Sequence, residues 1–156
     1  MENTFPLKSI IFFTESRLEN VSLVGVAVKA ICESIPLSGI HAMNIELSVV
    51  EGVTNVVKHA YGLKEDNEIE IAVLIFSDRI AIKISDTGKS MDPQRCKLEC
   101  EEINFERGNN EALPVGGMGL HIMHSIMDEM HYNTVSGKNT MTLVKKFEKK
   151  NITEKK

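Results

Sequence analysis

Three polar side chains recur at a four-residue spacing in an otherwise valine-rich segment, SVVEGVTNVVKHAYG at residues 48–62. In a helix that turns by about 100° per residue, Glu51, Asn55 and His59 lie on one face and the valines on another. A carboxylate and an amide oxygen one turn apart can hold a hard cation and can orient a hydroxyl group or a water molecule. Gly52 costs a helix roughly 1 kcal/mol relative to alanine, which suggests that it serves something other than helix stability. We expect it to permit a close approach to this face of the helix. The alternative is a polar face that is only solvated, with His59 in a structural role.

The second group lies at the end of a predicted strand, in RIAIKISDTGKSMD at residues 79–92. By strand parity, Asp86 continues the face of Ile82 and Ile84, so its carboxylate points to the core side. An unpaired charge there is costly, and Asp86 therefore needs a hydrogen-bond donor. A neighbouring backbone amide or hydroxyl could supply that donor, and so could a ligand. Gly88 allows a turn with positive φ and leaves room for a flat ligand against the backbone.

The third group is a glycine-rich turn before a predicted helix, GGMGLHIMHSIMDE at residues 116–129. Gly116, Gly117 and Gly119 leave backbone N–H groups beside the positive end of the helix dipole, which is a general anion-binding arrangement. The turn has neither the Lys-Ser/Thr pair of a Walker A loop nor the G-x-G-x-x-G dinucleotide pattern. Helical spacing further along predicts core positions at Leu120, Met123 and Met127.

Hydrophobic periodicity predicts the elements that must position these groups. The predicted strands span residues 10–14, 69–77, 79–85, 131–136 and 140–147, and the predicted helices span 17–34, 41–60 and 116–129. Gly62 is placed to cap the second helix, and the polar stretch 87–115 is too long for a plain connector. This order is not the βαβ alternation of a parallel sheet. It predicts an α+β two-layer sandwich in which about three helices cover one face of a mostly antiparallel sheet.

Composition indicates one domain at residues 1–147 and a disordered, lysine-rich tail at residues 148–156. The chain has 156 residues and a hydrophobic content of 42%, which is enough for a sizeable core. Its formal charge is −4, and because the C-terminal end is basic, the preceding body is more acidic still. An acidic body disfavours nucleic-acid binding. No apolar run is long enough for a membrane helix, and three cysteines without framework spacing fit free thiols, so we expect a cytoplasmic protein.

The three groups, in this order along the chain, resemble the N, G1 and G2 boxes of the GHKL or Bergerat-fold ATPases. The boxes are the Glu-x3-Asn helix, the strand-end pattern Asp86-x-Gly88-x3-Asp92 and the Gly-Gly-Met-Gly-Leu turn. Within that superfamily, EGVTNVVKHAYG and GGMGLHIMHSIMDE are similar to the anti-sigma-factor serine/threonine kinases of the bacterial sporulation and general stress responses. The resemblance covers residues 10–147 and implies the Bergerat fold.

The resemblance also implies a role for each matching residue. Glu51 would be the general base for a serine hydroxyl of a protein substrate, and Asn55 would ligate a Mg²⁺ ion that bridges the ATP phosphates. Asp86 would accept a hydrogen bond from the adenine amino group, which supplies the donor it needs. The other nucleotide-binding positions would be Gly88 in the adenine pocket, Gly116, Gly117 and Gly119 at the phosphates, Thr140 near adenine through a water molecule, and Asp92 and Leu120.

Two protein partners follow from the same resemblance. One would be a sigma factor, held away from RNA polymerase, and the other an anti-anti-sigma protein of the STAS-domain type whose serine is phosphorylated. Phosphorylation adds negative charge to that substrate and would dissociate it from an acidic kinase, which is then free to capture the sigma factor. Such kinases are usually homodimers, and the first strand and the hairpin are candidates for the dimer surface.

One departure from the family concerns these partners. The family often has an arginine in the middle of its first helix that contacts both of them, and a gapless alignment places Gly25 there. Lys29 and Arg17 are the candidate substitutes. The long polar stretch follows no family pattern closely enough to give Arg95 or Arg107 a phosphate role.

Three other interpretations compete with the kinase. An ATPase domain of a sensor histidine kinase would show the same boxes, but the chain before them is short for a dimerisation helix pair. A non-catalytic, nucleotide-gated binding module would keep the ATP site without phosphate transfer. A zinc site would use Cys96, Cys100, His121 and His124, whose spacing lies outside the usual zinc-finger ranges.

Overall fold

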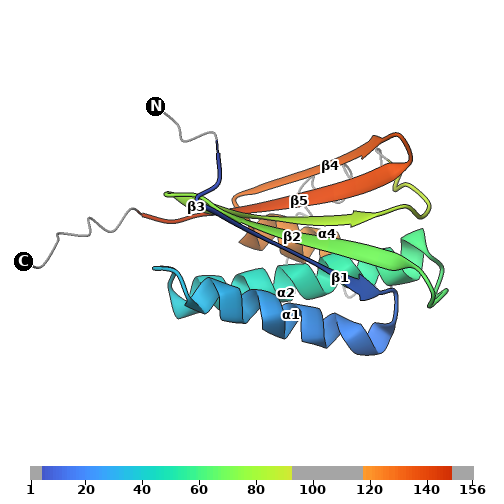
Figure 1. Ribbon diagram of the computed structural model, residues 1–156, viewed down its shortest axis with the longest axis horizontal. Coiled ribbons are helices and arrows are strands. Elements are labelled where there is room, and N and C mark those ends of the chain that lie inside the picture. The colour runs from blue at the N-terminus through green and yellow to red at the C-terminus, as the bar shows by residue number, and fades with distance from the viewer. Residues whose placement is uncertain (1–4, 93–117, 149–156) are drawn as a thin grey trace, which may run out of the picture.

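The computed structural model describes residues 5–92 and 118–148 as a sheet with helices on one side (Figure 1). The helices are α1 (Leu18–Glu33), α2 (Gly39–Asn55), η1 (Val56–Ala60) and α4 (Met118–Ile126). The strands are β1 (Lys8–Glu15), β2 (Glu68–Ile75), β3 (Arg79–Asp86), β4 (Glu129–Val135) and β5 (Lys138–Lys146). The predicted tail after residue 148 and most of the long polar stretch lie outside the described residues.

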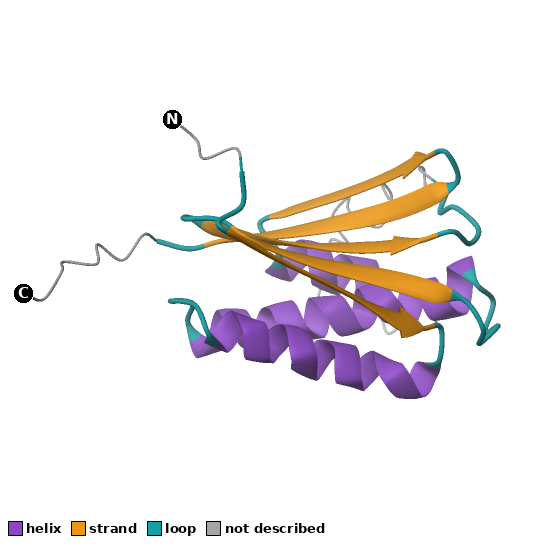
Figure 2. Cartoon of the chain, in the orientation of Figure 1, coloured by secondary structure: helices purple, strands orange, loops and turns teal. Residues whose placement is uncertain are grey.

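The strands form one sheet in the order β1-β2-β3-β5-β4, and every neighbouring pair is antiparallel. Figure 2 shows the helices together on one face of this sheet. The predicted α+β two-layer sandwich is confirmed. No helix in the described part of the chain is long and apolar enough to cross a membrane.

Strand alternation builds the core between the helices and the sheet. On β2, Ile69, Ile71 and Val73 have no exposed surface, and their even-numbered neighbours face the other side. The side chains of α1 that meet this layer are buried and recur at helical spacing: Val21, Val24, Val28 and Cys32. Cys32 is a free thiol, as predicted, and burial raises its pKa to about 12, so it is an inert core side chain.

The contact between α1 and α2 is too close for a side chain at Gly25. A Cβ atom there would lie 2.7 Å from Cγ2 of Val50 on α2. The position that aligns with the family's partner-contacting arginine is therefore buried between two helices. Lys29 is paired with Glu46 of α2 at 3.0 Å, so it also serves the helix contact. The other candidate, Arg17, lies among carboxylates and forms ion pairs with Glu15, Glu19, Glu65 and Asp66.

The second predicted helix is not α-helical to its end. From Val56 to Ala60 the chain widens into a π turn, in which the Tyr61 N–H donates to the Val56 carbonyl at 3.0 Å. Gly62, with φ at 60°, then ends the helix as predicted, and Leu63 shares the left-handed conformation with φ at 64°. π turns inside helices occur often at functional sites.

The third predicted helix ends three residues earlier than expected, at Ile126. The backbone N–H of Asp128 donates to the Val144 carbonyl at 2.9 Å, which brings the chain into the sheet at the start of β4. Lys145 stabilises this end of α4 because its ammonium group donates to the Ile126 carbonyl at 2.8 Å. Long-range sheet pairing, which local periodicity does not report, decides the boundary.

Candidate functional site

A cavity of about 430 Å³ lies between the C-terminal half of α2, η1, the end of β3, α4 and the β4–β5 hairpin. Its polar and aromatic lining includes Asn55, His59, Asp86, Asp92 and Tyr132, and its apolar lining includes Ile84, Leu120 and Met141. Asn55 of the predicted N box and Asp86 and Asp92 of the predicted G1 box thus meet at one cavity, whereas Glu51 and Gly88 are not among its lining residues. Its size lies within the range of small-molecule sites.

Asp86 is the most buried charged group of this cavity, with 5% of its surface exposed. Its Oδ1 accepts two hydrogen bonds, from the Gly88 N–H at 2.9 Å and from Nδ2 of Asn139 at 2.8 Å. Within the described residues, Oδ2 has no hydrogen-bond partner. The predicted local backbone donor is therefore real, but it satisfies only one of the two carboxylate oxygens, and the other is left for a ligand that can donate.

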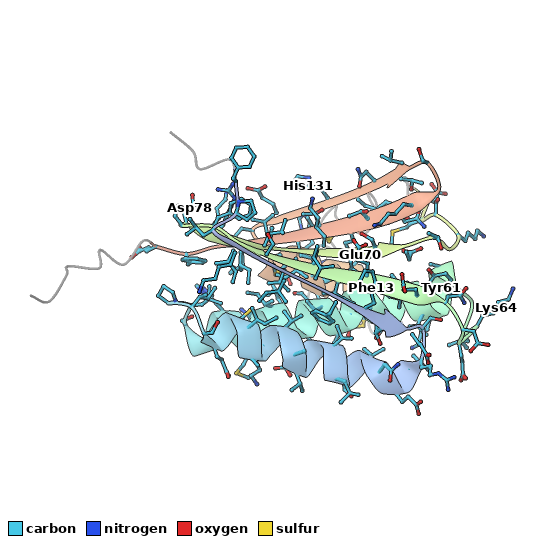
Figure 3. The ribbon with its side chains drawn as sticks, in the orientation of Figure 1. Phe13, Tyr61, Lys64, Glu70, Asp78 and His131 are labelled. Atoms are coloured by element: carbon cyan, nitrogen blue, oxygen red, sulfur yellow. The ribbon has the colours of Figure 1, made fainter. Side chains whose placement is uncertain are left out.

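The segment after β3 is held against the end of η1. Tyr61, labelled in Figure 3, is buried, and its hydroxyl accepts from the Thr87 N–H at 3.0 Å and donates to the Glu68 carbonyl at 2.8 Å. A Cβ atom at Gly88 would lie 2.6 Å from the carbonyl oxygen of Ala60. Gly88 is thus needed for a close approach of two backbone segments, and its φ is not positive, contrary to the turn that the sequence suggested.

Glycines also bring the acidic face of α2 close to its neighbours. A Cβ atom at Gly52 would lie 2.6 Å from Cδ1 of Ile84, so this glycine lets α2 pack on β3 at the cavity. A Cβ atom at Gly119 would lie 2.6 Å from Oε2 of Glu51 and 3.7 Å from Nδ2 of Asn55. The start of α4 therefore adjoins the two residues predicted for catalysis and for Mg²⁺ binding. Gly116 and Gly117 lie outside the described residues.

Comparison with known proteins places the chain in a family. A family model described as a histidine kinase-like ATPase domain matches residues 14–145. A serine-protein kinase RsbW of Staphylococcus epidermidis is 35% identical over 137 residues, which cover 86% of this chain and 84% of that protein. This chain belongs to the RsbW family of serine-protein kinases. The family resemblance inferred from the three boxes is confirmed.

Other relatives agree with this membership. The serine-protein kinase RsbW of Listeria monocytogenes serovar 1/2a is 31% identical over 112 residues, covering 72% of this chain and 71% of that protein. Among solved structures, the mycobacterial sensor histidine kinase MprB is similar in fold, with a TM-score of 0.51. The superposition covers 86% of this chain and 97% of the MprB chain. Its sequence identity is only 14%, so this likeness shows the fold alone. It agrees with the Bergerat fold that the boxes imply.

Strand parity turns one predicted nucleotide-binding residue away from the cavity in this member of the RsbW family. Thr140 pairs with Ser85, and their hydroxyl groups lie 3.1 Å apart on the sheet face opposite the cavity. Its neighbour Asn139 pairs with Asp86 and faces the cavity side. Thr140 therefore does not face the cavity, and its contact with adenine through a water molecule stays a prediction that this register disfavours. The alternation of buried Met141 and Leu143 along β5 was the signal that could have placed Asn139 correctly.

Tyr61, Ser90 and Tyr132 also shape the site and were not singled out from the sequence. The Tyr132 hydroxyl accepts from the Met91 N–H at 2.9 Å, and the Ser90 hydroxyl donates to Asn139 at 2.8 Å. A buried tyrosine hydroxyl usually needs a partner, which was the available signal for Tyr61. No cluster of three or more metal-binding His, Cys, Asp or Glu side chains occurs in the part of the chain that the structure describes. Cys96 and Cys100 of the zinc interpretation lie outside it.

Proposed function

We propose that this chain transfers the terminal phosphoryl group of ATP to a serine of a STAS-domain anti-anti-sigma protein, and that it also sequesters a sigma factor. The observation that carries the proposal is the Asp86 carboxylate, which is buried at the cavity with one oxygen held and the other without a partner among the described residues. The proposal is supported by the two relatives named serine-protein kinases.

The residues at the cavity fit ATP and Mg²⁺. Apolar side chains of Ile84, Met141 and Val56 line it beside Asp86, which suits a flat, apolar base with an amino group at its edge. The side-chain oxygen of Asn55 is a hard ligand of the kind that Mg²⁺ prefers. When bound, Mg²⁺-ATP supplies the phosphoryl group and neutralises the charge that develops during its transfer.

The chain's own residues then have distinct tasks. Asp86 would hold the base through Oδ2, and Asn55, which also lines the cavity, would hold the metal. Glu51, one helical turn from Asn55, accepts the proton of the substrate serine as the new oxygen–phosphorus bond forms and the bond to ADP breaks. Gly119 leaves the space in which the Glu51 carboxylate lies. The remaining predicted contacts of Gly88, Asp92, Gly116, Gly117 and Leu120 with the nucleotide are part of this proposal.

The partner exchange follows from charge. The formal charge of the chain is −4, and phosphorylation adds negative charge to the STAS-domain substrate, so the product is repelled and the sigma factor is bound. We further propose that the kinase acts as a homodimer in the bacterial cytoplasm, without membrane or direct nucleic-acid contact.

Glu51→Gln and Asp86→Asn test the proposal together. Calorimetric titration of ATP with Mg²⁺ should show binding to wild type and to Glu51→Gln, and loss of binding in Asp86→Asn. Transfer of labelled phosphate to the purified STAS-domain protein should fall roughly 10²- to 10⁴-fold in Glu51→Gln, because the general base is removed. Glu33→Gln, at an exposed position of α1, is the matched control and should transfer normally.

Two outcomes would contradict the kinase. If wild type binds ATP but transfers no phosphate, the chain is the nucleotide-gated binding module. If ATP binds equally well to wild type and to Asp86→Asn, the cavity is not the base site that we propose.

A further inference from the structure

Asn139 has no exposed surface and uses its whole hydrogen-bonding capacity beside the candidate base site. Its Nδ2 donates to Oδ1 of Asp86 at 2.8 Å and to the Gly88 carbonyl at 3.0 Å. Its Oδ1 accepts from the hydroxyls of Ser90 and Thr134, both at 2.8 Å. One amide therefore joins the end of β3, the segment that follows it and the β4–β5 hairpin.

These four contacts fix which way the amide points. If the amide were turned over, its oxygen would face the Asp86 carboxylate and the Gly88 carbonyl, so that three acceptors would meet without a donor. Buried acceptors without donors are costly, whereas the observed orientation gives each of them one. Asn139 thus always presents its NH₂ group to Asp86.

The fixed amide in turn fixes the carboxylate. Two donors, Nδ2 of Asn139 and the Gly88 N–H, hold the same oxygen, Oδ1 of Asp86. The carboxylate then has little freedom to rotate, because rotation would break both hydrogen bonds. Among the described residues no donor meets Oδ2, which remains as an acceptor at a defined place beside the cavity.

We propose that Asn139 is a positioning residue for base selection, which holds Asp86 so that Oδ2 accepts only from a base that carries an amino group. The proposal rests on the proposed nucleotide site and names what sets its selectivity. A purine with a carbonyl oxygen at the same place would set acceptor against acceptor. A carboxylate that is free to turn away would discriminate less between the two.

The test compares the affinities of ATP and inosine triphosphate, in which a carbonyl oxygen replaces the amino group, by calorimetry with Mg²⁺. Asn139→Leu keeps roughly the volume of the side chain, adds no charge and cannot donate to Asp86 or to the Gly88 carbonyl. Asn139→Ala removes the whole amide. Asn133→Ala, an exposed asparagine on β4, is the matched control, and thermal unfolding of each variant monitors folding.

The readout is the ratio of the two affinities, which a purely structural role would not change. We expect wild type and Asn133→Ala to prefer ATP, and we expect both Asn139 variants to lose roughly tenfold or more of that preference, mainly through weaker ATP binding. Because Asn139→Leu roughly preserves the volume of the side chain, it carries the test if Asn139→Ala does not fold.

Two different failures can be separated. If the Asn139 variants bind both nucleotides more weakly by the same factor, or bind as wild type does, Asn139 only supports the fold and this inference is wrong. In that case Asp86→Asn would still abolish ATP binding, and the nucleotide site would stand. If Asp86→Asn leaves ATP binding unchanged, the nucleotide site itself fails, and this inference fails with it.

Discussion

Glycine at position 119 leaves room for the side chain of Glu51, and this matters more than the backbone freedom that glycine provides. A Cβ atom there would lie 2.6 Å from Oε2 of Glu51, which is the far end of a flexible side chain. The carboxylate can move away at little cost to the fold. The same small movement displaces the group that we propose as general base.

Gly119→Ala should therefore separate stability from catalysis. Alanine is favoured over glycine in a helix by up to about 1 kcal/mol, so the free energy of unfolding should stay constant or rise slightly. Phosphate transfer should fall by roughly ten- to a hundredfold, because a misplacement of about 1 Å can cost that much. Urea unfolding and transfer of labelled phosphate measure the two effects.

The control for Gly119→Ala is Gly39→Ala in the first turn of α2, where an added Cβ would meet nothing within 4 Å. It should give the gain in helix stability without a loss of transfer. Full transfer by Gly119→Ala would show that Glu51 need not lie where the structure has it.

Individual site residues were predictable to different degrees. Asp86 could be placed because strand parity aims it at the core, where a carboxylate needs a donor. Asn139 could not be recognised, because the role that we propose for it depends on pairing between β3 and β5. Asn139 and Asp86 are 53 residues apart in sequence. The orientation of Thr140 was missed for the same reason, since a shift of one residue reverses the face on which a strand side chain lies.

Among the elements, the pair α1 and α2 depends on one close contact. A Cβ atom at Gly25 would lie 2.7 Å from Cγ2 of Val50, and a β-branched valine has few alternative rotamers with which to yield. The ion pair of Lys29 with Glu46 spans the same contact. Sequence alignment alone suggested that Gly25 replaces a partner-binding arginine. The packing shows a separate requirement for glycine, because a larger residue would clash with Val50 of α2.

Gly25→Ala should loosen the helix pair. We expect the free energy of unfolding to fall by about 1–3 kcal/mol relative to Gly39→Ala, because overpacking outweighs the helix preference of alanine. Urea denaturation measures the difference. Adding Val50→Ala to Gly25→Ala should recover part of the lost stability, since it removes Cγ2 of Val50, the atom with which the new Cβ clashes. If Gly25→Ala is as stable as Gly39→Ala, the helices can separate freely and the close contact is not required.

The element order was predictable from periodicity, and the exceptions share one cause. The strands and helices follow patterns of period two and 3.6, which neighbouring residues determine. The π turn at Val56–Ala60 and the early end of α4 depend on contacts with distant parts of the chain. At the end of α4, for example, the Asp128 N–H pairs with Val144 on β5. Such contacts leave no local periodic signal.

For the whole molecule, the sheet face opposite the helices carries apolar side chains near its β1 edge. Ile11 and Phe13 are 57% and 55% exposed, and Phe13 pairs with Glu70 of β2 (Figure 3). Leu74 of β2 pairs with Ser9 of β1 and packs against a small buried cluster of Phe76, Ala81 and Val144. A second copy of the chain that presents the same face would cover this surface, in agreement with the proposed homodimer and with the first strand as its contact.

Phe13→Asp should dissociate that dimer. Covering a large apolar side chain is worth about 1.5–3 kcal/mol, and in a two-fold symmetric contact each substitution acts twice, so the dissociation constant should rise roughly 10²- to 10⁴-fold. Sedimentation velocity over a range of concentrations measures it. Leu23→Asp is the matched control, because Leu23 is 66% exposed on α1, on the helical layer. If Leu23→Asp dissociates the dimer and Phe13→Asp does not, the dimer contact lies on the helices, and the proposed contact through the apolar sheet face is wrong.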